Sequence, residues 1–280
     1  MNRNAALLCA LAAVAGCAQG PLTKPAAPPP AVASAEAKAQ LAPIGALRVA
    51  VLTSNPLIGS KDPKSGELGG TTVALGRRLA ERAGLPAKMI EYPAIGALMK
   101  DASTGAWDVA VVAIDPERRN VLDFMPAHMA ADGFLTVLVP PGSEARSMAD
   151  IDRPGMRIAA VRAAAPAMIL QRTLKHAAVV PAENEDAAFA LMKGGKAEGY
   201  AQNRFMLRGR AATLPGSRVL DDAFAGLRLS FALPKNRPAA AQFVAAFIEE
   251  AKASGAVQSA IDAAGVGGDV KVAPAEPAAK

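Results

Sequence analysis

Short apolar runs alternate with segments of helical periodicity from residue 47 onward. The run Leu47–Leu52 predicts a strand at the start of the folded part of the chain. Residues 71–83 carry apolar side chains at helical spacing and are followed by Gly84, which predicts a helix that ends there. Further strands are predicted at residues 89–92, 108–113 and 134–139, with another helix beginning near Ile95. Such alternation is typical of parallel sheets with helices on both faces.

The same alternation begins again in the second half of the chain. Residues 156–161 are similar to the first strand, and helices and strands are then predicted in turn at residues 167–174, 179–180, 187–192 and 198–201. A last helix is predicted over residues 239–253, and Phe243 and Phe247 fall on its apolar face as core residues. Two successive starts predict two α/β lobes, although no exact sequence repeat relates them.

The N-terminus carries a targeting signal. Arg3 precedes an apolar run, residues 5–15, that is shorter than the roughly 20 residues needed to span a bilayer. The run ends in Val14-Ala15-Gly16-Cys17, which resembles the bacterial lipobox, whose cysteine is lipidated after cleavage. The alternative is a free cysteine, but the apolar run and the small residues before it favour the lipobox. We therefore predict a lipoprotein signal peptide at residues 1–16 and a lipid anchor on Cys17.

Two segments have the composition of flexible chain. Residues 17–44 are rich in Ala and Pro, which predicts an extended tether between the lipid and the folded part. Residues 267–280 have similar character and are predicted to be a disordered tail.

Composition also narrows the chemistry. Cys9 and Cys17 are the two cysteines, and Cys9 lies in the predicted signal peptide, so the mature chain keeps no thiol for catalysis or for zinc. The chain has two histidines, no G-x-S-x-G motif and no metal-spaced cluster, so we expect no enzyme activity, no metal and no cofactor. The net charge of +6 is scattered and aromatic residues make up 4%, so we expect no nucleic-acid partner.

Motifs in a characteristic order extend from about residue 46 to residue 266. They are the opening LRVAV, the G-x-x-V-x-L pattern from Gly70 to Gly84, the segment from Ala97 to Phe124 with its ligand loop ending in D-F, residues 151–161, and the Gly195–Gly199 turn. Together they resemble the bacterial family 3 extracellular solute-binding proteins, the polar-amino-acid binders of ABC transporters.

This resemblance implies a type II periplasmic-binding-protein fold, an α/β architecture in which two lobes are joined by two hinge strands. It implies a discontinuous lobe one, residues 45–140 and 227–266, and a lobe two at residues 141–226. A small molecule would lie in the cleft between the lobes, and the closed form would dock on a membrane permease.

Arg118 is the leading candidate for ligand contact. Asp115 is predicted to cap a helix that begins at Pro116, so Arg118 falls in its first turn, where free N–H groups and the helix dipole already favour an anion. A guanidinium grips a carboxylate through two parallel hydrogen bonds. The alternative from the residues alone is a local pair of Arg118 with Asp115 or Glu117 on a surface helix. In the family that the chain resembles, the arginine here holds the ligand's α-carboxylate.

Other positions depart from the family pattern. Ala163 and Ala164 occupy the positions of a Gly-Thr pair, Asn203 that of an ammonium-binding Asp, and Ala113 that of a Ser or Thr. An aromatic residue is missing in the stretch that begins at Asn55, which is a candidate for the edge of the cleft. His128 stands where Tyr is common and is a second candidate there, although a surface or hinge histidine is the favoured alternative. The predicted ligand-binding residues are therefore Arg118, Ala113, Asp115, Ala163, Ala164 and Asn203. These changes favour a mono- or dicarboxylate, or another small anion, over a standard α-amino acid.

The sequence thus predicts a monomeric solute-binding protein that captures a small carboxylate-bearing molecule and delivers it to an ABC permease. Its predicted location is the periplasm, with the lipid anchor in the inner or the outer membrane. The alternatives are a sensor or binding module of the same fold with a degenerate cleft and, less favoured, a dehydratase- or lyase-like enzyme.

Overall fold

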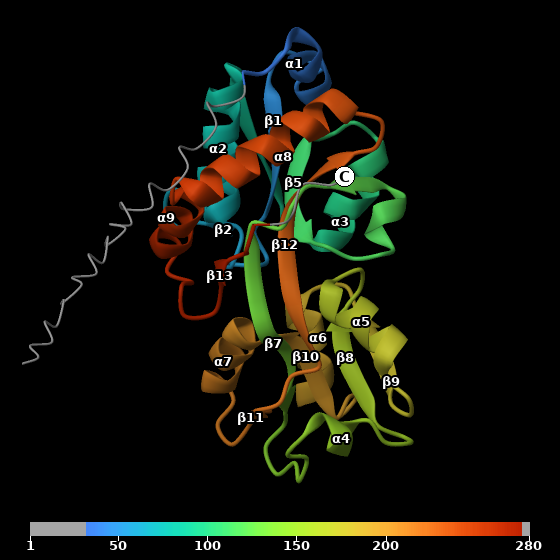
Figure 1. Cartoon of the computed structure of the whole chain (residues 1–280). Coiled ribbons are helices and arrows are strands. Elements are labelled where there is room, and N and C mark those ends of the chain that lie inside the picture. Colours follow the sequence, from blue (N-terminus) through green and yellow to red (C-terminus); the bar gives the residue numbers. More distant parts are fainter. Residues whose placement is uncertain (1–31, 276–280) are drawn as a thin grey trace, which may run out of the picture.

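A computed structural model describes residues 32–275 of the chain. Two lobes lie one above the other and are joined by long strands (Figure 1). The predicted signal peptide and Cys17 lie outside the described residues.

Lobe one is built on a parallel sheet of β4 (Ala87–Tyr92), β1 (Leu47–Leu52) and β5 (Val109–Ala113). It carries the helices α2 (Thr71–Ala83), α3 (Ile95–Lys100), α8 (Pro238–Ala253) and α9 (Ala256–Ala263). It also carries the hairpin of β2 (Ser60–Lys61) with β3 (Leu68–Gly69) and the 3-10 turn η1 (Asp101–Ser103). β1 and β5 are almost wholly apolar and buried because helices cover the middle of the sheet on both faces. The edge strand β4 is more polar and largely exposed.

Lobe two repeats this plan with β10 (Gly199–Asn203), β8 (Arg157–Val161) and β9 (Ala178–Ala182) as its parallel strands. Its helices are α4 (Met148–Ile151), α5 (Ala165–Thr173), α6 (Glu185–Lys193) and α7 (Arg204–Ala212), and the short strand β11 (Arg218–Val219) pairs with β7. The two starts read from the hydrophobic pattern are therefore two sets of parallel strands, one in each lobe.

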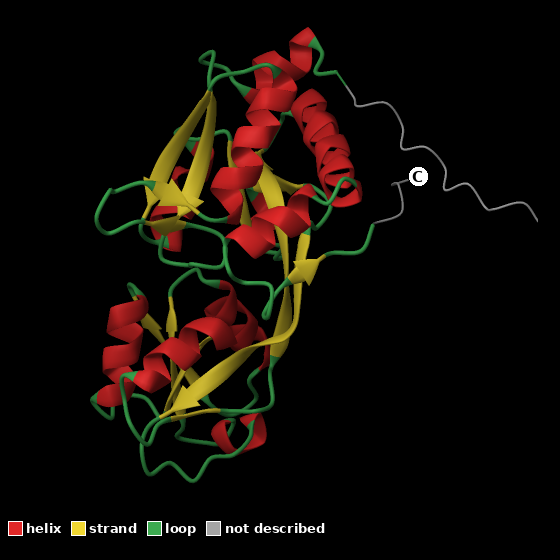
Figure 2. Cartoon of the chain, turned by 90° about the vertical axis from the view of Figure 1, so that its left-hand side faces the viewer, coloured by secondary structure: helices red, strands yellow, loops and turns green. Residues whose placement is uncertain are grey.

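Two long antiparallel strands join the lobes, β7 (Met129–Val139) and β12 (Ala225–Pro234). β12 pairs with β5 of lobe one and β7 pairs with β10 of lobe two, so one hydrogen-bonded path runs β4-β1-β5-β12-β7-β10-β8-β9. Figure 2 shows both strands passing from lobe to lobe. Such a connection lets two rigid lobes rotate about a hinge.

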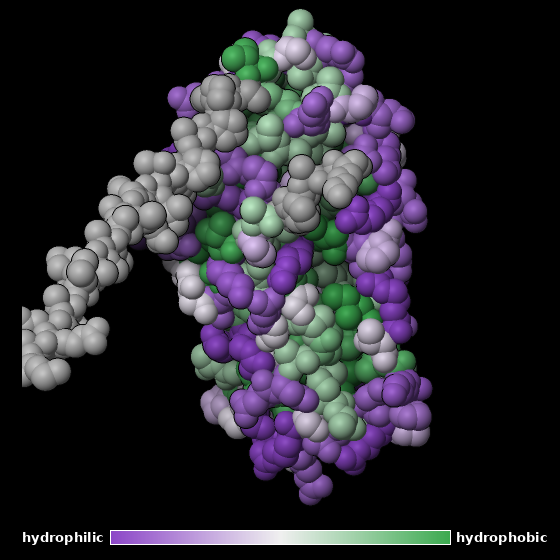
Figure 3. Space-filling model, in the orientation of Figure 1, coloured by the Kyte–Doolittle hydropathy of each residue, from purple (hydrophilic) through white to green (hydrophobic). Residues whose placement is uncertain are grey.

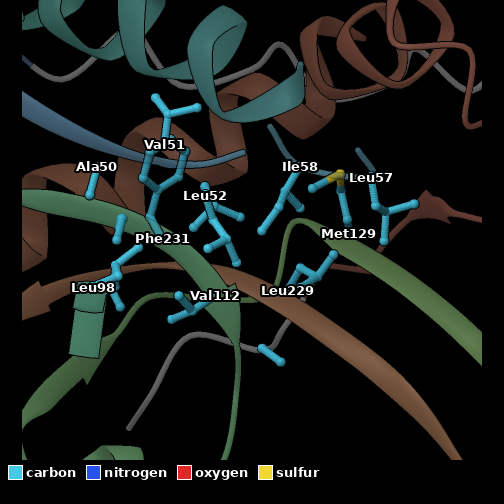
Figure 4. Close-up of a cluster of buried hydrophobic side chains, with 14 of the residues drawn as sticks. Ala50, Val51, Leu52, Leu57, Ile58, Leu98, Val112, Met129, Leu229 and Phe231 are labelled. Atoms are coloured by element: carbon cyan, nitrogen blue, oxygen red, sulfur yellow. The ribbon is translucent and has the colours of Figure 1, made fainter. Parts of the chain in front are cut away.

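The core of lobe one lies where these strands meet the helices. Val51, Leu57 and Phe231 are fully buried there among other apolar side chains (Figure 4). Burying each such side chain stabilises the fold by about 1.5–3 kcal/mol. Leu52, Ile58, Val112 and Leu229 belong to the same cluster and also reach the gap between the lobes.

The predicted tether is too long at its C-terminal end. Residues 35–41 form helix α1 (Ala35–Leu41), which begins at the N-cap Ser34 and buries Leu41 against lobe one. The side chain of Gln40 accepts hydrogen bonds from the N–H groups of Ala239 and Ala240 and so caps helix α8. The Ala-rich composition that suggested extended chain also favours a helix, and packing against α8 decides between the two.

The predicted disordered tail is wrong for residues 267–275. The strand β13 (Lys271–Val272) pairs with the start of β7, and Lys271 forms a 2.6 Å ion pair with Asp132. Val270 and Ala273 are buried. The C-terminal segment therefore packs along the hinge as a further strand.

Hydrophilic residues are spread over both lobes on the face shown in Figure 3, with hydrophobic residues between them. None of the helices between residues 32 and 275 combines the length and apolar character needed to cross a bilayer.

Candidate functional site: the cleft between the lobes

A cavity lies between the lobes, at the edge where the parallel strands end. The carboxyl ends of parallel strands meet at one edge of a sheet and commonly form ligand sites in open α/β folds. Leu52 ends β1, Ala113 ends β5 and Asn203 ends β10, and all three line this cavity. Its volume is about 60 Å³. The polar residues in its lining are Ser54, Asn55, Arg118, Glu185, Gln202 and Asn203.

The rest of the lining is apolar and continuous with the core. Leu52, Ile58, Val112 and Leu229 form part of it, as Figure 4 shows for the cluster from which they come. The lining residues include no aromatic side chain. The cavity is therefore a small apolar pocket with a few polar groups converging on it, which is typical of small-molecule sites.

Arg118 lies at the junction of the lobes and is only 4% exposed. Its two terminal nitrogens donate to the carbonyl of Ala113 in lobe one, at 2.9 Å, and to the carbonyl of Ala163 in lobe two, at 2.8 Å. Its Nε is buried without a partner, and no carboxylate of the described residues forms a salt bridge with it. Burial lowers the pKa of Arg118 to about 10, so the guanidinium stays charged at neutral pH.

The predicted helix around Arg118 is wrong. Asp115 does accept the N–H of Glu117, at 2.9 Å, but the chain forms only a 3-10 turn, η2 (Arg118–Asn120), before entering β6 (Leu122–Phe124). β6 pairs with β12, which leaves no length for a helix. Because no helix begins here, no helix dipole adds to the positive charge of Arg118. Arg119 points away from the cavity, is exposed, and lies 5.5 Å from the ring centre of Phe124.

A helix N-terminus does reach the cavity, but it belongs to lobe two. Helix α5 begins after Ala164, which offers no capping side chain, and Ala164, Ala165 and Pro166 line the cavity. Ala163 has a left-handed backbone with φ of 60°, which costs an alanine about 1–2 kcal/mol and is free of strain for glycine. That backbone turns the Ala163 carbonyl toward Arg118. The N–H of Ala164 is already used, because it donates to Val161 at 3.1 Å.

Asp115 does not line the cavity and instead holds the two lobes together. Its buried carboxylate accepts the guanidinium of Arg172 from helix α5, at 2.6 Å, and the same guanidinium reaches Glu117 at 3.2 Å. A second bridge between the lobes joins Arg208 of α7 to Asp269 at 3.0 Å. The structure is therefore a closed form with polar contacts on both sides of the cleft.

Arg172→Ala is expected to favour the open form. A hydrogen-bonded contact with a buried charge contributes about 1–3 kcal/mol, and because Arg172 is partly exposed we expect this bridge to contribute about 1–2 kcal/mol. Its loss should raise the ratio of open to closed molecules by ~5- to 30-fold. Distances between spin labels on the two lobes, measured without ligand, give the ratio of open to closed molecules. The matched control is Arg162→Ala, because Arg162 is exposed and pairs only within lobe two, with Glu183. Unchanged distance distributions in Arg172→Ala would show that the bridge does not hold the closed form.

The remaining predicted residues are distributed unevenly around the site. Ala113, Asn203 and Asn55 line the cavity, as do Arg118 and Ala164. Asn203 caps helix α7 through its Oδ1, which accepts the N–H of Met206 at 2.8 Å, while its Nδ2 is buried without a partner. Asn55 uses its side chain to accept the N–H of Leu57.

His128 does not line the cavity, so its candidate place at the cleft edge is wrong, whereas the alternative of a hinge histidine fits its position directly before β7. It is fully buried at the start of the hinge strands, with its ring 5.3 Å from that of Phe231. Neither ring nitrogen has a hydrogen-bond partner among residues 32–275. Burial, with the nearby charge of Lys252, lowers the pKa of His128 to about 3. His128 occupies the position of a tyrosine in the family, but its side chain points into the core and is therefore not exposed to the cleft.

Sequence reasoning missed Glu185 and Gln202. Glu185 is in the first turn of α6 and Gln202 is the residue before Asn203, and both line the cavity. The usable signal was topological, because each follows or ends a parallel strand of lobe two at the edge where ligands bind. Within residues 32–275, no group of His, Cys, Asp and Glu has the arrangement of a metal site.

Two hinged α/β lobes around a small polar-tipped cavity define a solute-binding protein of the periplasmic type. Residues 47–263 match the model of the bacterial extracellular solute-binding proteins, family 3, so the chain belongs to that family. The resemblance read from the motifs is confirmed. The family's members are solute-binding proteins that act outside the cytoplasm.

Known relatives agree with this family. The chain is 23% identical over 209 residues to the ABC transporter glutamine-binding protein GlnH of Bacillus subtilis, covering 73% of this chain and 76% of the relative. It is 26% identical over 184 residues to a glutamine-binding protein of Geobacillus stearothermophilus, covering 64% and 69%. A mutant of the arginine-binding protein of T. maritima has the same fold, with a TM-score of 0.68, 21% identity, and coverage of 81% of this chain and 98% of the other. The predicted two-lobed fold is thereby confirmed.

An ancestral amino acid-binding protein, described as a precursor of cyclohexadienyl dehydratase, also shares the fold. Its TM-score is 0.66 at 21% identity, with 80% of this chain and 96% of the other covered.

Proposed function

We propose that this protein captures a small carboxylate-bearing solute in the cleft between its lobes and delivers it to an ABC-type permease. The observation that carries the proposal is Arg118, a buried cation that lines the cavity without a carboxylate partner. Within the part of the chain that the structure describes, its Nε and the Nδ2 of Asn203 are two buried donors without acceptors. Buried polar groups are nearly always hydrogen-bonded, and a ligand carboxylate between the lobes supplies two acceptor oxygens.

Closure follows from the same geometry. Arg118 comes from lobe one, while Asn203 and the N-terminus of α5 come from lobe two. A carboxylate that contacts both lobes stabilises the closed form relative to the open form, because only the closed form offers all of these donors at once. The closed form is then the state for a permease to recognise.

We further propose that the mature protein is a monomer that is anchored in the periplasm by lipid on Cys17. The intact mass of the purified protein tests whether the lipid is present.

A thermal-shift screen tests the solute class. The purified protein is heated with small monocarboxylates, dicarboxylates, amino acids, and sulfate and phosphate as inorganic anions. A true ligand at a hundred times its dissociation constant should stabilise the fold by about 2.7 kcal/mol. We expect carboxylates to raise the melting temperature and the inorganic anions to leave it unchanged. No shift with any carboxylate would contradict the proposal. If a solute does raise the melting temperature, its uptake is then compared in cells with and without the gene.

A second candidate function is a sensor or binding module whose cleft no longer takes a ligand. The observation that favours it is the engagement of both terminal nitrogens of Arg118 by protein carbonyls, which closes the cleft without a solute. The two functions differ in the same screen, because a self-closed module would show no shift with any compound.

A further inference from the structure

A second cavity lies between the lobes and shares Arg118 with the first. Lobe one contributes Met99 from helix α3 and Val121, which follows η2, and lobe two contributes Met168 from helix α5. In Figure 1 both helices lie on the right-hand side, with α3 in lobe one and α5 below it in lobe two. We call this second cavity the rim groove, and its further lining residues are Glu117, Arg162, Ala163, Ala167, Gln171 and Pro181.

Both lobes contribute apolar side chains to the rim groove. Val121 is 40% exposed and is one of three large apolar residues that are exposed between residues 32 and 275. Met99 and Met168 have unbranched, flexible side chains, which adapt to ligands of different shape and are frequent at apolar binding surfaces. Apolar surface that is left open in a groove is typical of a place that a ligand covers. The rim groove is therefore suited to the hydrocarbon part of a ligand.

Arg118 adds a positive charge to the groove that the protein leaves partly unsatisfied. Its Nε is buried and has no acceptor among the described residues. The other charged side chains of the lining are paired, because Arg162 contacts Glu183 at 3.1 Å. Similarly, Glu117 contacts Arg172 at 3.2 Å. The groove thus offers a donor to a carboxylate, whereas the acid in its lining is already taken by an arginine and is not free to hold an ammonium group.

We propose that the rim groove is the subsite for the body of the solute, and that the solute is a monocarboxylate with a hydrocarbon body and no amine. The proposal rests on the proposed function, since it takes the carboxylate of the solute to lie at Arg118, which lines both cavities. The hydrocarbon body then lies between Met99 of lobe one and Met168 of lobe two. Because this body contacts both lobes, its burial adds to the stability of the closed form.

The sizes of the two cavities favour this division of the solute. The first cavity, at about 60 Å³, is less than half of the roughly 150 Å³ of an engineered cavity that holds benzene. The rim groove, at about 320 Å³, falls within the range of roughly 300–1,000 Å³ that is usual for small-molecule pockets. A body of about six carbons, the size of benzene, therefore fits the groove but not the first cavity.

Calorimetric titration of the full-length protein in detergent, with the heat of each acid in detergent alone subtracted, tests the proposal. The probes are acetate, hexanoate and norleucine, which is hexanoate with an amine on its second carbon. Each methylene that leaves water tightens binding by about fourfold, so hexanoate should bind roughly 10- to 100-fold more tightly than acetate in a partly open groove. Norleucine should bind more weakly than hexanoate, because its ammonium group loses water without gaining an acid partner.

Two substitutions separate the rim groove from the carboxylate site. Val121→Ser and Met168→Ala remove apolar surface from the groove, and neither residue lines the first cavity. Each should lower the ratio of the hexanoate affinity to the acetate affinity by about 4- to 15-fold, the equivalent of about one or two methylenes. Val121 is exposed, so its replacement should leave the melting temperature nearly unchanged. The matched control is Ile44→Ser, because Ile44 is also a large exposed apolar residue and lies outside both cavities.

The outcomes separate this inference from the proposed function. If acetate and hexanoate bind equally, or if Val121→Ser and Met168→Ala keep the wild-type ratio, the role of the rim groove is overturned and the carboxylate site stands. If neither acid binds, the proposed function fails as well. Norleucine that binds as tightly as hexanoate would overturn the exclusion of an amine. Hexanoate that binds Arg118→Ala as it binds the wild type would show that Arg118 does not hold its carboxylate.

Discussion

Arg118→Ala is expected to weaken binding of a carboxylate solute by about 2–5 kcal/mol, or roughly 30-fold to several thousand-fold. The guanidinium is buried and charged, and its Nε has no hydrogen-bond partner among the described residues. Alanine removes every donor that lobe one directs at the solute from this position. Titration of wild type and variant with the solute that emerges from the thermal-shift screen measures the loss.

Two further variants make the result specific to the geometry of the guanidinium. Arg118→Lys keeps a cation but cannot donate two parallel hydrogen bonds, so its affinity should fall between those of wild type and alanine. Arg119→Ala is the matched control, because this neighbouring arginine is exposed and packs over Phe124 rather than into the cavity. Unchanged affinity in Arg118→Ala, with the fold verified by circular dichroism, would remove Arg118 from the site.

The elements of the fold could be predicted from hydrophobic periodicity because they are covered on their apolar faces. The predicted strand at residues 47–52 and helix at residues 71–83 coincide with β1 and α2. β1 is a continuous apolar run that is buried on both faces, whereas α2 buries one face with the helical period and ends at Gly84 in a left-handed conformation. Local pattern and tertiary structure agree at these elements, so the prediction holds.

The candidate site could be predicted only in part because its contacts join distant segments. The Asp-Pro signal at Asp115 predicts a helix cap, and Asp115 does accept the N–H of Glu117, but no helix follows. The carboxylate is instead taken by Arg172, which is 57 positions away. Glu185 in the first turn of a helix has the pattern of an ordinary favourable helix charge. Its place in the cavity depends on how α6 packs on lobe two. Such pairings depend on the closed arrangement of the two lobes, about which no short motif carries information.

His128 is expected to make the protein sensitive to acid. Its folded-state pKa of about 3 lies far below the ordinary value of 6.5, because burial excludes the charged ring. The stability that this neutral histidine contributes is complete above pH 6.5 and is lost as pH falls toward 3. At 1.36 kcal/mol per pH unit, the loss between pH 6.5 and pH 4 amounts to about 3 kcal/mol.

His128→Leu should remove this part of the acid sensitivity. Leucine fills the space beside Phe231 without burying two unpaired nitrogens, so stability at pH 7 should be equal or higher. Urea unfolding of wild type and variant at pH 7, 5 and 4 measures the difference, and the gap between them should widen by about 3 kcal/mol on going to pH 4. His176→Leu is the control, because it replaces the other histidine of the sequence, which is exposed in lobe two. A gap that stays constant across this pH range would mean that the ring of His128 takes up a proton in the folded protein, and hence that the hinge admits water or a charged partner to it.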